Sequence, residues 1–436
     1  MKLKLVEIEN YRAIDELQLP IHPSLTVLHG DNAHGKTSVL SAIAAGLGMI
    51  PRMLPEVYGI NFRKGDQRVS HRPMRVDLTT TEGVGWRRAT ADTSGRTPFG
   101  RLGFRRMAIV ERTLREEIEA IVNAEREGHD PKDLPIIAFY GTERAVSDRL
   151  PFRRGFGKSF PRFTALEGAL SARANFRDFA EWFYAWENEE LREQKERRDF
   201  DYRLKELDAV RRAITSMVPG ASKLHIKHRP LRIMLSFKPD AGETETLSLE
   251  QLSGGYRIVL AVAGDLARRM AHGNPHLPDP LASEAIVLID EIELHLHPSW
   301  QQRILADLTR TFSNAQFIVS THSPQVLTTV KPEHVVELRR ERGGIVAESA
   351  SAPTYGAEAG DVLATVMGVD ERPSGNEFAK KLARYTDLVA DGKGGSPRAV
   401  SLRQDLDELS PRDPALDRAD IEIRRRKLLE SMGKSR

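Results

Sequence analysis

A glycine-containing loop near the start of the chain has the residue types that hold phosphate. Residues 30–37 fit the pattern GxxxxGK[ST], in which backbone N–H groups surround phosphates and the N-terminus of the following helix adds its positive dipole. Lys36 is expected to meet the β- and γ-phosphates of a nucleotide, and Thr37 to place its hydroxyl on Mg²⁺. A strand is expected before the loop and a helix after it, which favours this interpretation over an ordinary glycine turn. The candidate nucleotide-binding residues here are Gly30, Asp31, Asn32, Ala33, His34, Gly35, Lys36, Thr37 and Ser38.

A second candidate element is an apolar run that ends in two carboxylates. Residues 285–289 are all apolar, as in a buried parallel strand, and Asp290 and Glu291 follow directly. Asp290 is expected to hold Mg²⁺, directly or through water, and Glu291 to polarise the attacking water, because phosphoryl transfer needs charge neutralisation and a positioned nucleophile. Taken alone, this stretch is better interpreted as a core strand that ends at a surface acidic pair.

Two further segments resemble motifs of ABC ATPases. Residues 251–257 resemble the signature LSGGQ, with Tyr256 where that family usually has glutamine. The backbone N–H groups of Ser253, Gly254 and Gly255 lie at the start of an expected helix and suit a clamp on a γ-phosphate. His322 follows an expected strand and resembles the switch histidine, which contacts the γ-phosphate and the attacking water. Taken alone, the first segment is also consistent with a generic helix start and the second with a structural histidine.

The four segments occur in the order found in ABC-type ATPases of the RecF, SMC and OLD group. The stretch Asn10-Tyr11-Arg12 is similar to an N-F/Y-R element of that group, which implies that Arg12 lies close to the nucleotide. The resemblance covers residues 1–143 and 216–350. It implies ATP and Mg²⁺ as ligands, and a homo-oligomer built from head-to-tail dimers in which the signature of one copy completes the site of the other.

Two histidines raise the alternative of a zinc site. His295 and His297 follow Glu293 closely, but their position after the acidic pair matches the D-loop of the family, which crosses the dimer seam, and no further ligand set is evident. The Q-loop of the family is harder to place. Gln67 is the candidate for it, with an ordinary polar loop as the alternative.

Four segments carry a closer similarity, to PtuA-type ATPases. They are residues 134–144, 181–190, 290–301 and 354–373. This resemblance implies a role in bacterial defence against phage, an HNH endonuclease such as PtuB as partner, and a place in a retron system with its RNA or DNA. The rival hypotheses are a RecF-like DNA repair ATPase that binds duplex DNA without a nuclease, and the ATPase subunit of a membrane transporter.

The pattern of strands and helices predicts an α/β fold with a short, mainly helical insertion and a helical C-terminal tail. The resemblance implies that the α/β part is an ABC-type P-loop NTPase head, which the insertion splits. Residues 1–143 form the first lobe, 144–215 the insertion, 216–350 the second lobe and 351–436 the C-terminal region. Within the insertion, an apolar stripe that includes Trp182 and Trp186 is interpreted as helix packing in preference to base stacking.

Composition limits the possible partners. The 436 residues include 65 basic and 62 acidic ones and no cysteine, so any nucleic-acid surface must be local and thiolate chemistry is excluded. No stretch could span a bilayer, and the alternating start lacks a secretory signal, so a cytoplasmic location is expected. Basic residues interleaved with aromatic ones either grip a nucleic-acid backbone or are solvated arginines beside a small core. They are Arg101, Arg105, Arg106, Arg112, Arg149, Arg153, Arg154, Lys158 and Arg162, with Phe152, Phe156 and Phe160.

Overall fold

A computed structural model describes most of the chain, in two compact units. The described residues are 1–69, 72–90, 101–143, 160–172, 176–228, 231–238, 242–342, 344–350, 352–370 and 372–433. The first unit is Met1–Val362 and the second is Leu363–Arg436. Of the basic and aromatic residues singled out above, Arg149, Phe152, Arg153, Arg154, Phe156 and Lys158 lie outside the described residues, as do the side chains of Arg101, Arg105, Arg106 and Arg112.

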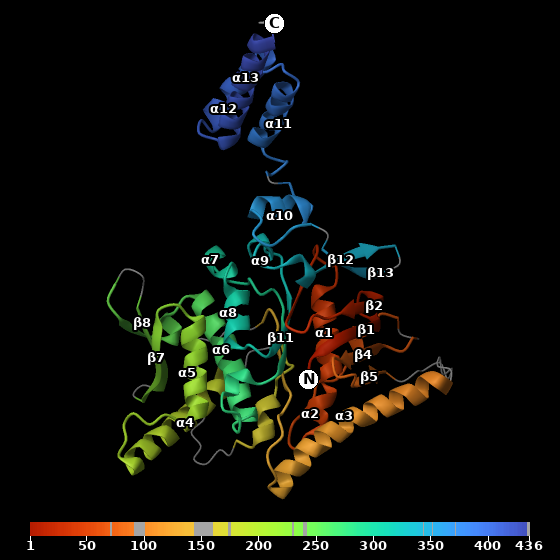
Figure 1. Ribbon diagram of the computed structural model, residues 1–436, viewed down its shortest axis with the longest axis vertical. Coiled ribbons are helices and arrows are strands. Elements are labelled where there is room, and N and C mark those ends of the chain that lie inside the picture. Colours follow the sequence, from red (N-terminus) through yellow and green to blue (C-terminus); the bar gives the residue numbers. More distant parts are fainter. Residues whose placement is uncertain are drawn as a thin grey trace. The chain divides into compact units, whose positions relative to one another are not determined.

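A mostly parallel sheet of six strands forms the centre of the first unit (Figure 1). Its order is β13(Gly344–Ser349), β12(Val335–Glu341), β3(Leu25–His29), β11(Ala315–Ser320), β10(Ala285–Ile289) and β6(Ile136–Tyr140). Only β13 runs antiparallel to its neighbour. Every residue of β3, β6, β10 and β11 is buried, which explains why these strands read as continuous apolar runs.

The register of this sheet aligns the ends of three strands. Val319 of β11 pairs with Val27 of β3 on one side and with Ile289 of β10 on the other. The strands are parallel, so their carboxyl ends meet at one edge of the sheet. The loop after β3, the acidic pair after β10 and the segment after β11 therefore leave the sheet side by side.

A second, antiparallel sheet covers the other side of α1(Lys36–Leu47). Its order is β2(Ile14–Pro20), β1(Leu3–Tyr11), β4(Arg75–Thr80) and β5(Gly85–Ala89), and β4 and β5 form a hairpin. Helix α1 packs against β4 of this sheet and β11 of the central one (Figure 1). The indole N–H of Trp86 donates to the carbonyl oxygen of Gly46 at 2.9 Å and ties the sheet to the end of the helix.

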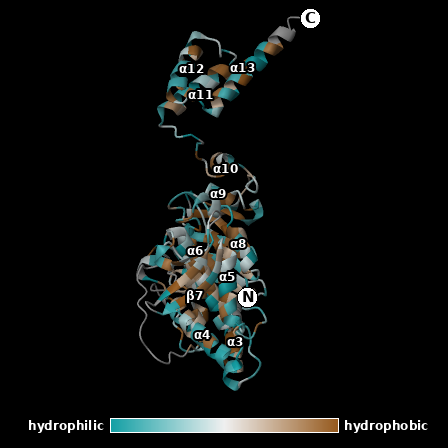
Figure 2. Ribbon diagram, turned by 90° about the vertical axis from the view of Figure 1, so that its left-hand side faces the viewer, coloured by the Kyte–Doolittle hydropathy of each residue, from teal (hydrophilic) through white to brown (hydrophobic). Residues whose placement is uncertain are grey.

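Helices cover the remaining sides of the first unit. They are α2(Met49–Met53), α3(Arg101–Glu127), α4(Phe176–Arg197), α5(Lys205–Met217), α6(Gly254–Gly273), α7(Pro298–Gln301), α8(Ile304–Thr311) and α9(Pro324–Leu327), and α10(Ala359–Thr365) ends at the start of the second unit. A small sheet of β7(Ala221–His228), β8(Leu231–Phe237) and β9(Glu245–Ser248) lies beside α5. Helix α6 is buried from Ile258 onward and packs against α4, α5 and β6. Figure 2 colours these elements by hydropathy and shows apolar residues gathered in the interior.

The described part of segment 144–215 holds α4 and most of α5. Phe179, Trp182 and Phe183 of α4 are fully buried, and the rings of Trp182 and Trp186 stack with centroids 4.9 Å apart. The interpretation of the aromatic stripe as helix packing is confirmed. The boundaries of the insertion stay a prediction.

A charged network lies inside this packing. Asp265 of α6 accepts hydrogen bonds from the hydroxyl of Tyr140 at 2.9 Å, from Arg268 at 2.8 Å and from Arg269 at 2.7 Å. Burial alone would raise the pKa of Asp265, but the two guanidinium groups outweigh it and hold that pKa below its ordinary value. A buried carboxylate with this many donors stays ionised and ties α6 to the end of β6.

The second unit has its own core. It contains α11(Glu377–Ala390), α12(Pro397–Leu409) and α13(Pro414–Gly433), in agreement with the predicted helical C-terminal region. These helices bury an apolar cluster formed by Leu382, Tyr385, Val389, Ala399, Leu406, Leu416 and Ala419. No helix among the described residues is both long and apolar enough to cross a membrane.

Candidate nucleotide site

The P-loop, residues 30–37, joins β3 to α1 in a conformation that requires glycine at two points. Gly30 has φ 143°, and a Cβ there would clash with the carbonyl oxygen of Leu338 on β12. Gly35 has φ 88°, caps α1, and leaves only 2.5 Å between an added Cβ and the Cδ1 of Ile345 on β13. The hairpin of β12 and β13 therefore supports the loop from one side.

The middle of the P-loop is open to solvent. Asp31, Asn32 and Ala33 are exposed, and Ala33 has φ 66°. The Nδ1 atom of His34 lies 3.0 Å from the carbonyl oxygen of Leu338 and 3.2 Å from the backbone nitrogen of Asp31. Exposed backbone at a helix start, held from behind, is the arrangement that receives a phosphate.

Lys36 is buried and bonded to its own loop. Its ammonium group donates to the carbonyl oxygens of Gly30 at 2.8 Å and Asp31 at 2.9 Å. Burial lowers the pKa of Lys36 below its ordinary value, against the opposing effect of the carboxylates of Asp290 and Glu291. The two carbonyl dipoles balance the positive charge of the ammonium group only in part, and a bound phosphate would balance it more fully.

One buried carboxylate joins the ends of two strands to the start of α1. Asp290, after β10, accepts a hydrogen bond from the hydroxyl of Thr37 at 2.8 Å and another from the hydroxyl of Ser320, the last residue of β11, at 2.5 Å. The structure thus brings together the two residues predicted to hold Mg²⁺. A hydroxyl and a carboxylate suit Mg²⁺, which takes oxygen ligands and commonly uses one or two from the protein beside those of substrate phosphates.

Glu291 begins the D-loop, residues 291–297, in a left-handed conformation. Its φ is 48°, and its backbone N–H donates to the hydroxyl of Ser320 at 2.8 Å. A positive φ at a non-glycine residue is costly and is held here by the surrounding hydrogen bonds. The half-buried side chain of Glu291 lies directly after the buried Asp290 at the edge of the sheet.

Glu293 is a site residue that sequence reasoning missed. Its carboxylate accepts hydrogen bonds from the hydroxyl of Thr321 at 2.8 Å and from the backbone N–H of His322 at 2.6 Å. The signal in the sequence was a third acid two positions after Glu291. The described residues contain no cluster of three or more histidines or acids that could hold a metal, so nothing in them adds support to the zinc alternative at His295 and His297.

The signature residues, Ser253, Gly254 and Gly255, are not among the residues that the hydrogen bonds around Asp290 and Glu293 bring together. Ser253 caps α6 without a side-chain hydrogen bond, and both Ser253 and Gly254 are exposed. Nothing lies within 4 Å of a Cβ added at Gly254, whereas one at Gly255 would meet the carbonyl oxygen of His295 at 3.0 Å. The signature loop is thus packed against the D-loop on one side and open on the other.

Tyr256, the departure from the usual signature, is held between two aromatic rings. Its ring centroid lies 4.6 Å from that of Trp300 on α7 and 5.4 Å from that of Phe237 on β8, both in edge-to-face geometry. These contacts connect the signature helix to the helix that follows the D-loop.

Two weaker predictions fall beside the site. The Arg12 guanidinium donates to Asp66 at 2.9 Å and lies 3.4 Å from the hydroxyl of Ser41, one turn beyond Thr37 on α1. Its contact with nucleotide stays a prediction. Gln67 donates its side-chain amide to the carbonyl oxygen of Arg72 at 2.6 Å, and its role as the Q-loop residue also stays a prediction.

Arg162 is the one arginine of the basic and aromatic set whose side chain is among the described parts of the chain, and it is hydrogen-bonded within the protein. Arg162 donates to Glu125 at 3.0 Å and to the carbonyl oxygen of Gly273 at 2.6 Å. These bonds hold α3 and the end of α6 together. At this position the alternative of packing beside a small core is favoured over contact with a nucleic acid.

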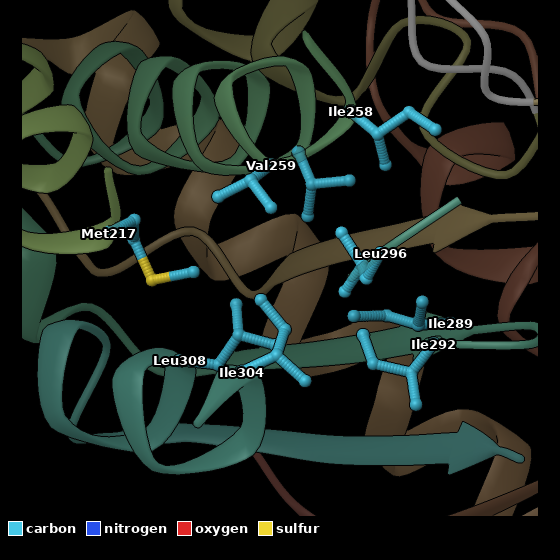
Figure 3. A pocket seen from close by; sticks show the side chains of 9 residues that line it. Met217, Ile258, Val259, Ile289, Ile292, Leu296, Ile304 and Leu308 are labelled. Atoms are coloured by element: carbon cyan, nitrogen blue, oxygen red, sulfur yellow. The ribbon is translucent and has the colours of Figure 1, made fainter. Parts of the chain in front are cut away.

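A small apolar cavity lies under the D-loop. Figure 3 shows side chains from β10, α6, α8 and the D-loop pointing toward one another. The cavity of about 10 Å³ is too small for a water molecule to occupy comfortably and offers it no polar partner. It is a packing gap in the core beneath the edge of the sheet at which Asp290 and Glu291 lie. The gap is lined by Met217, Ile258, Val259, Val262, Ile289, Ile292, Leu296, Ile304 and Leu308.

Comparisons with known proteins agree with this geometry. A family model described as an AAA domain matches residues 5–218, and another described as "AAA domain, putative AbiEii toxin, Type IV TA system" matches residues 121–328. The "Retron Ec83 probable ATPase" of Escherichia coli is 28% identical over 97% of this chain and 86% of its own length. The chain is an ATPase related to the retron and PtuA ATPases.

Further matches differ in how much of this chain they cover. The "Retron Vc95 probable ATPase" of Vibrio cholerae is 24% identical over 90% of this chain and 84% of its own length. The "Septu protein PtuA" of Bacillus mycoides is 42% identical, over 17% of this chain and 10% of its own length. Among solved structures, an Smc head bound to the C-winged helix domain of ScpA covers 80% of this chain and 98% of its own, with a TM-score of 0.42 and 15% identity.

The conformation of the P-loop leads to a first prediction. Gly35→Ala is expected to weaken ATP binding about tenfold or more. The reason is that alanine is strained at a φ of 88° and its Cβ would clash with Ile345, which would distort the P-loop. Isothermal titration calorimetry measures the affinity. Gly83→Ala is the matched control, since Gly83 has φ 85° in open space on a hairpin turn. An unchanged affinity in the Gly35 variant would contradict the assignment of this loop.

Proposed function

We propose that this ATPase binds ATP with Mg²⁺ and hydrolyses it with Glu291 as the residue that polarises the attacking water and His322 as the residue that contacts the γ-phosphate. The observation that carries the proposal is the pair of hydrogen bonds from Thr37 and Ser320 to Asp290. They bring the start of α1 and the ends of β10 and β11 to one point, where phosphate, metal and water would have to meet.

Each residue has a distinct task in this proposal. Backbone N–H groups of residues 31–38 receive the phosphates, and Lys36 exchanges its two carbonyl partners for phosphate oxygens. Thr37 and Asp290 would hold Mg²⁺, which when bound neutralises phosphate charge. Glu291 accepts a hydrogen bond from the attacking water and orients it toward the γ-phosphate.

We further propose that the complete site needs two copies of the chain. The support is the exposure of Ser253 and Gly254 at the N-terminus of a long buried helix. The space beside Gly254 is open, so a ligand held by another copy could reach the backbone of this loop. In a head-to-tail pair, this loop of one copy faces the P-loop of the other across the γ-phosphate. ATP then closes the pair, and hydrolysis reopens it.

The biological role that we propose is defence against phage, in which the closing and opening of the pair controls an HNH endonuclease. Support comes from the retron ATPase of Escherichia coli, which matches 97% of this chain, and from the partial match to PtuA. The described residues contain no metal cluster of three or more histidines or acids, so the nuclease chemistry is assigned to a partner. The RNA or DNA of a retron is the proposed nucleic acid in this assembly.

Substitutions at two residues test hydrolysis. Glu291→Gln should lower kcat for ATP about 100-fold or more while ATP still binds, because the amide keeps the shape but is a poor acceptor from water. Lys36→Ala should abolish ATP binding. A coupled phosphate-release assay and calorimetry measure both, with Glu119→Gln on the exposed face of α3 as control. Turnover at the unsubstituted rate by the Glu291 variant would refute its assigned role.

Mixing two inactive variants tests whether sites are shared between copies. Lys36→Ala and Ser253→Arg each disable one half of a site. A head-to-tail heterodimer of the two contains one site with both defects and one intact site, so the mixture should regain about a quarter of the unsubstituted activity. Sites contained within one chain would give no recovery, because every chain in the mixture carries a defect.

Co-purification tests the proposed partner. The tagged chain, expressed with the genes next to its own, should retain an HNH protein at a fixed ratio, and mass photometry with and without ATP measures the assembly. Glu291→Gln should trap the closed form and change nuclease activity on plasmid DNA relative to the unsubstituted complex. Absence of any nuclease in the purified assembly would contradict this part of the proposal.

A further inference from the structure

The D-loop and the segment after β11 form one hydrogen-bonded body within a single chain. The two carboxylate oxygens of Glu293 are both used: Oε2 accepts from the hydroxyl of Thr321 at 2.8 Å, and Oε1 from the backbone N–H of His322 at 2.6 Å. Short bonds to an ionised acceptor are about twice as strong as those between neutral groups. Glu293 therefore fixes the peptide plane at which the chain turns from β11 into His322.

A second contact reinforces the first. The side-chain oxygen of Gln301, on α7, accepts from the hydroxyl of Ser323 at 2.6 Å, and its amide donates to the carbonyl oxygen of Leu296 in the D-loop at 2.8 Å. The hydroxyl of Thr321 also accepts from the backbone N–H of Ser323 at 3.0 Å. Residues 321–323, the switch segment, are thus held at both ends by the D-loop and the helix after it.

We propose that Glu293 is a positioning residue for hydrolysis, which orients His322 through its backbone and transmits movement of the D-loop to it. This inference rests on the proposed function, in which His322 meets the γ-phosphate. Glu293 has both oxygens turned to the switch segment, so its effect on the reaction passes through His322. A displacement of the D-loop when two copies close moves Glu293, and the two hydrogen bonds carry that movement to the histidine.

The chemistry of the pair explains why the position needs a carboxylate. Two donors converge on Glu293, and only an ionised carboxyl group offers an acceptor oxygen to each. Glutamine keeps the size of the side chain but replaces one acceptor by an N–H₂ group, and the hydroxyl of Thr321 must turn to accept from it. Both hydrogen bonds then lose the charge that strengthens them, and His322 gains freedom of orientation.

The test separates orientation from binding. Glu293→Gln is expected to lower kcat about tenfold and leave the Kd for ATP within about twofold, because the P-loop is untouched. Thr321→Val removes only the hydroxyl donor and should lower kcat less. The double variant should match Glu293→Gln alone, since both act on one network. Glu119→Gln, exposed on α3, is the control and should leave every parameter unchanged.

The outcomes distinguish this inference from the proposed function. Unchanged kcat in Glu293→Gln, or effects of the two substitutions that multiply in the double variant, would overturn the positioning role. A loss of ATP affinity or of melting temperature in proportion to kcat would assign Glu293 to structure only and would overturn it as well. Lys36→Ala and Glu291→Gln are measured in parallel: if they lose turnover while Glu293→Gln does not, the proposed function stands without this inference.

Discussion

The buried carboxylate of Asp290 is the interaction on which the candidate site depends. It accepts from Thr37 at the start of α1 and from Ser320 at the end of β11, and it follows β10 itself. A carboxylate that is almost fully buried needs such donors, because a buried polar group without hydrogen bonds is costly. The hydroxyl of Ser320 serves a second time, as acceptor for the backbone N–H of Glu291. One small group of polar atoms thus sets the geometry of the P-loop helix, of Asp290 and of Glu291 together.

The charge balance around Lys36 suits the proposed phosphate ligand. The buried ammonium group of Lys36 donates to carbonyl oxygens, and the nearby carboxylates only partly offset the desolvation that lowers its pKa. In the proposed site, Mg²⁺ and a triphosphate would supply compensating charges to Lys36 and Asp290.

The signature helix is connected to the rest of the site by packing and buried charge. Tyr256 fills the position of the usual glutamine and packs between Trp300 and Phe237. Further along α6, Asp265 accepts a hydrogen bond from the hydroxyl of Tyr140. The backbone carbonyl of Tyr140 in turn accepts from the N–H of Asp290 at 2.8 Å. These contacts tie α6 to the elements that carry the acidic pair. In the proposed head-to-tail pair, such packing would reduce the freedom that the signature loop loses on association.

The sequence by itself determined the local elements and the residue types of the site. Composition and spacing within a short window indicate the P-loop with its glycines and Lys36, the apolar run before Asp290 and the helix after Ser253. The α/β class and the relation to the retron and PtuA ATPases are both confirmed. The pairings across the site were decided only by the tertiary structure. Thr37 and Asp290 are 253 positions apart and Glu293 and His322 are 29 apart, and no periodicity reports which side chains will meet. Those pairings depend on the order and register of β3, β11 and β10, which are set by the packing of the whole sheet between its helices.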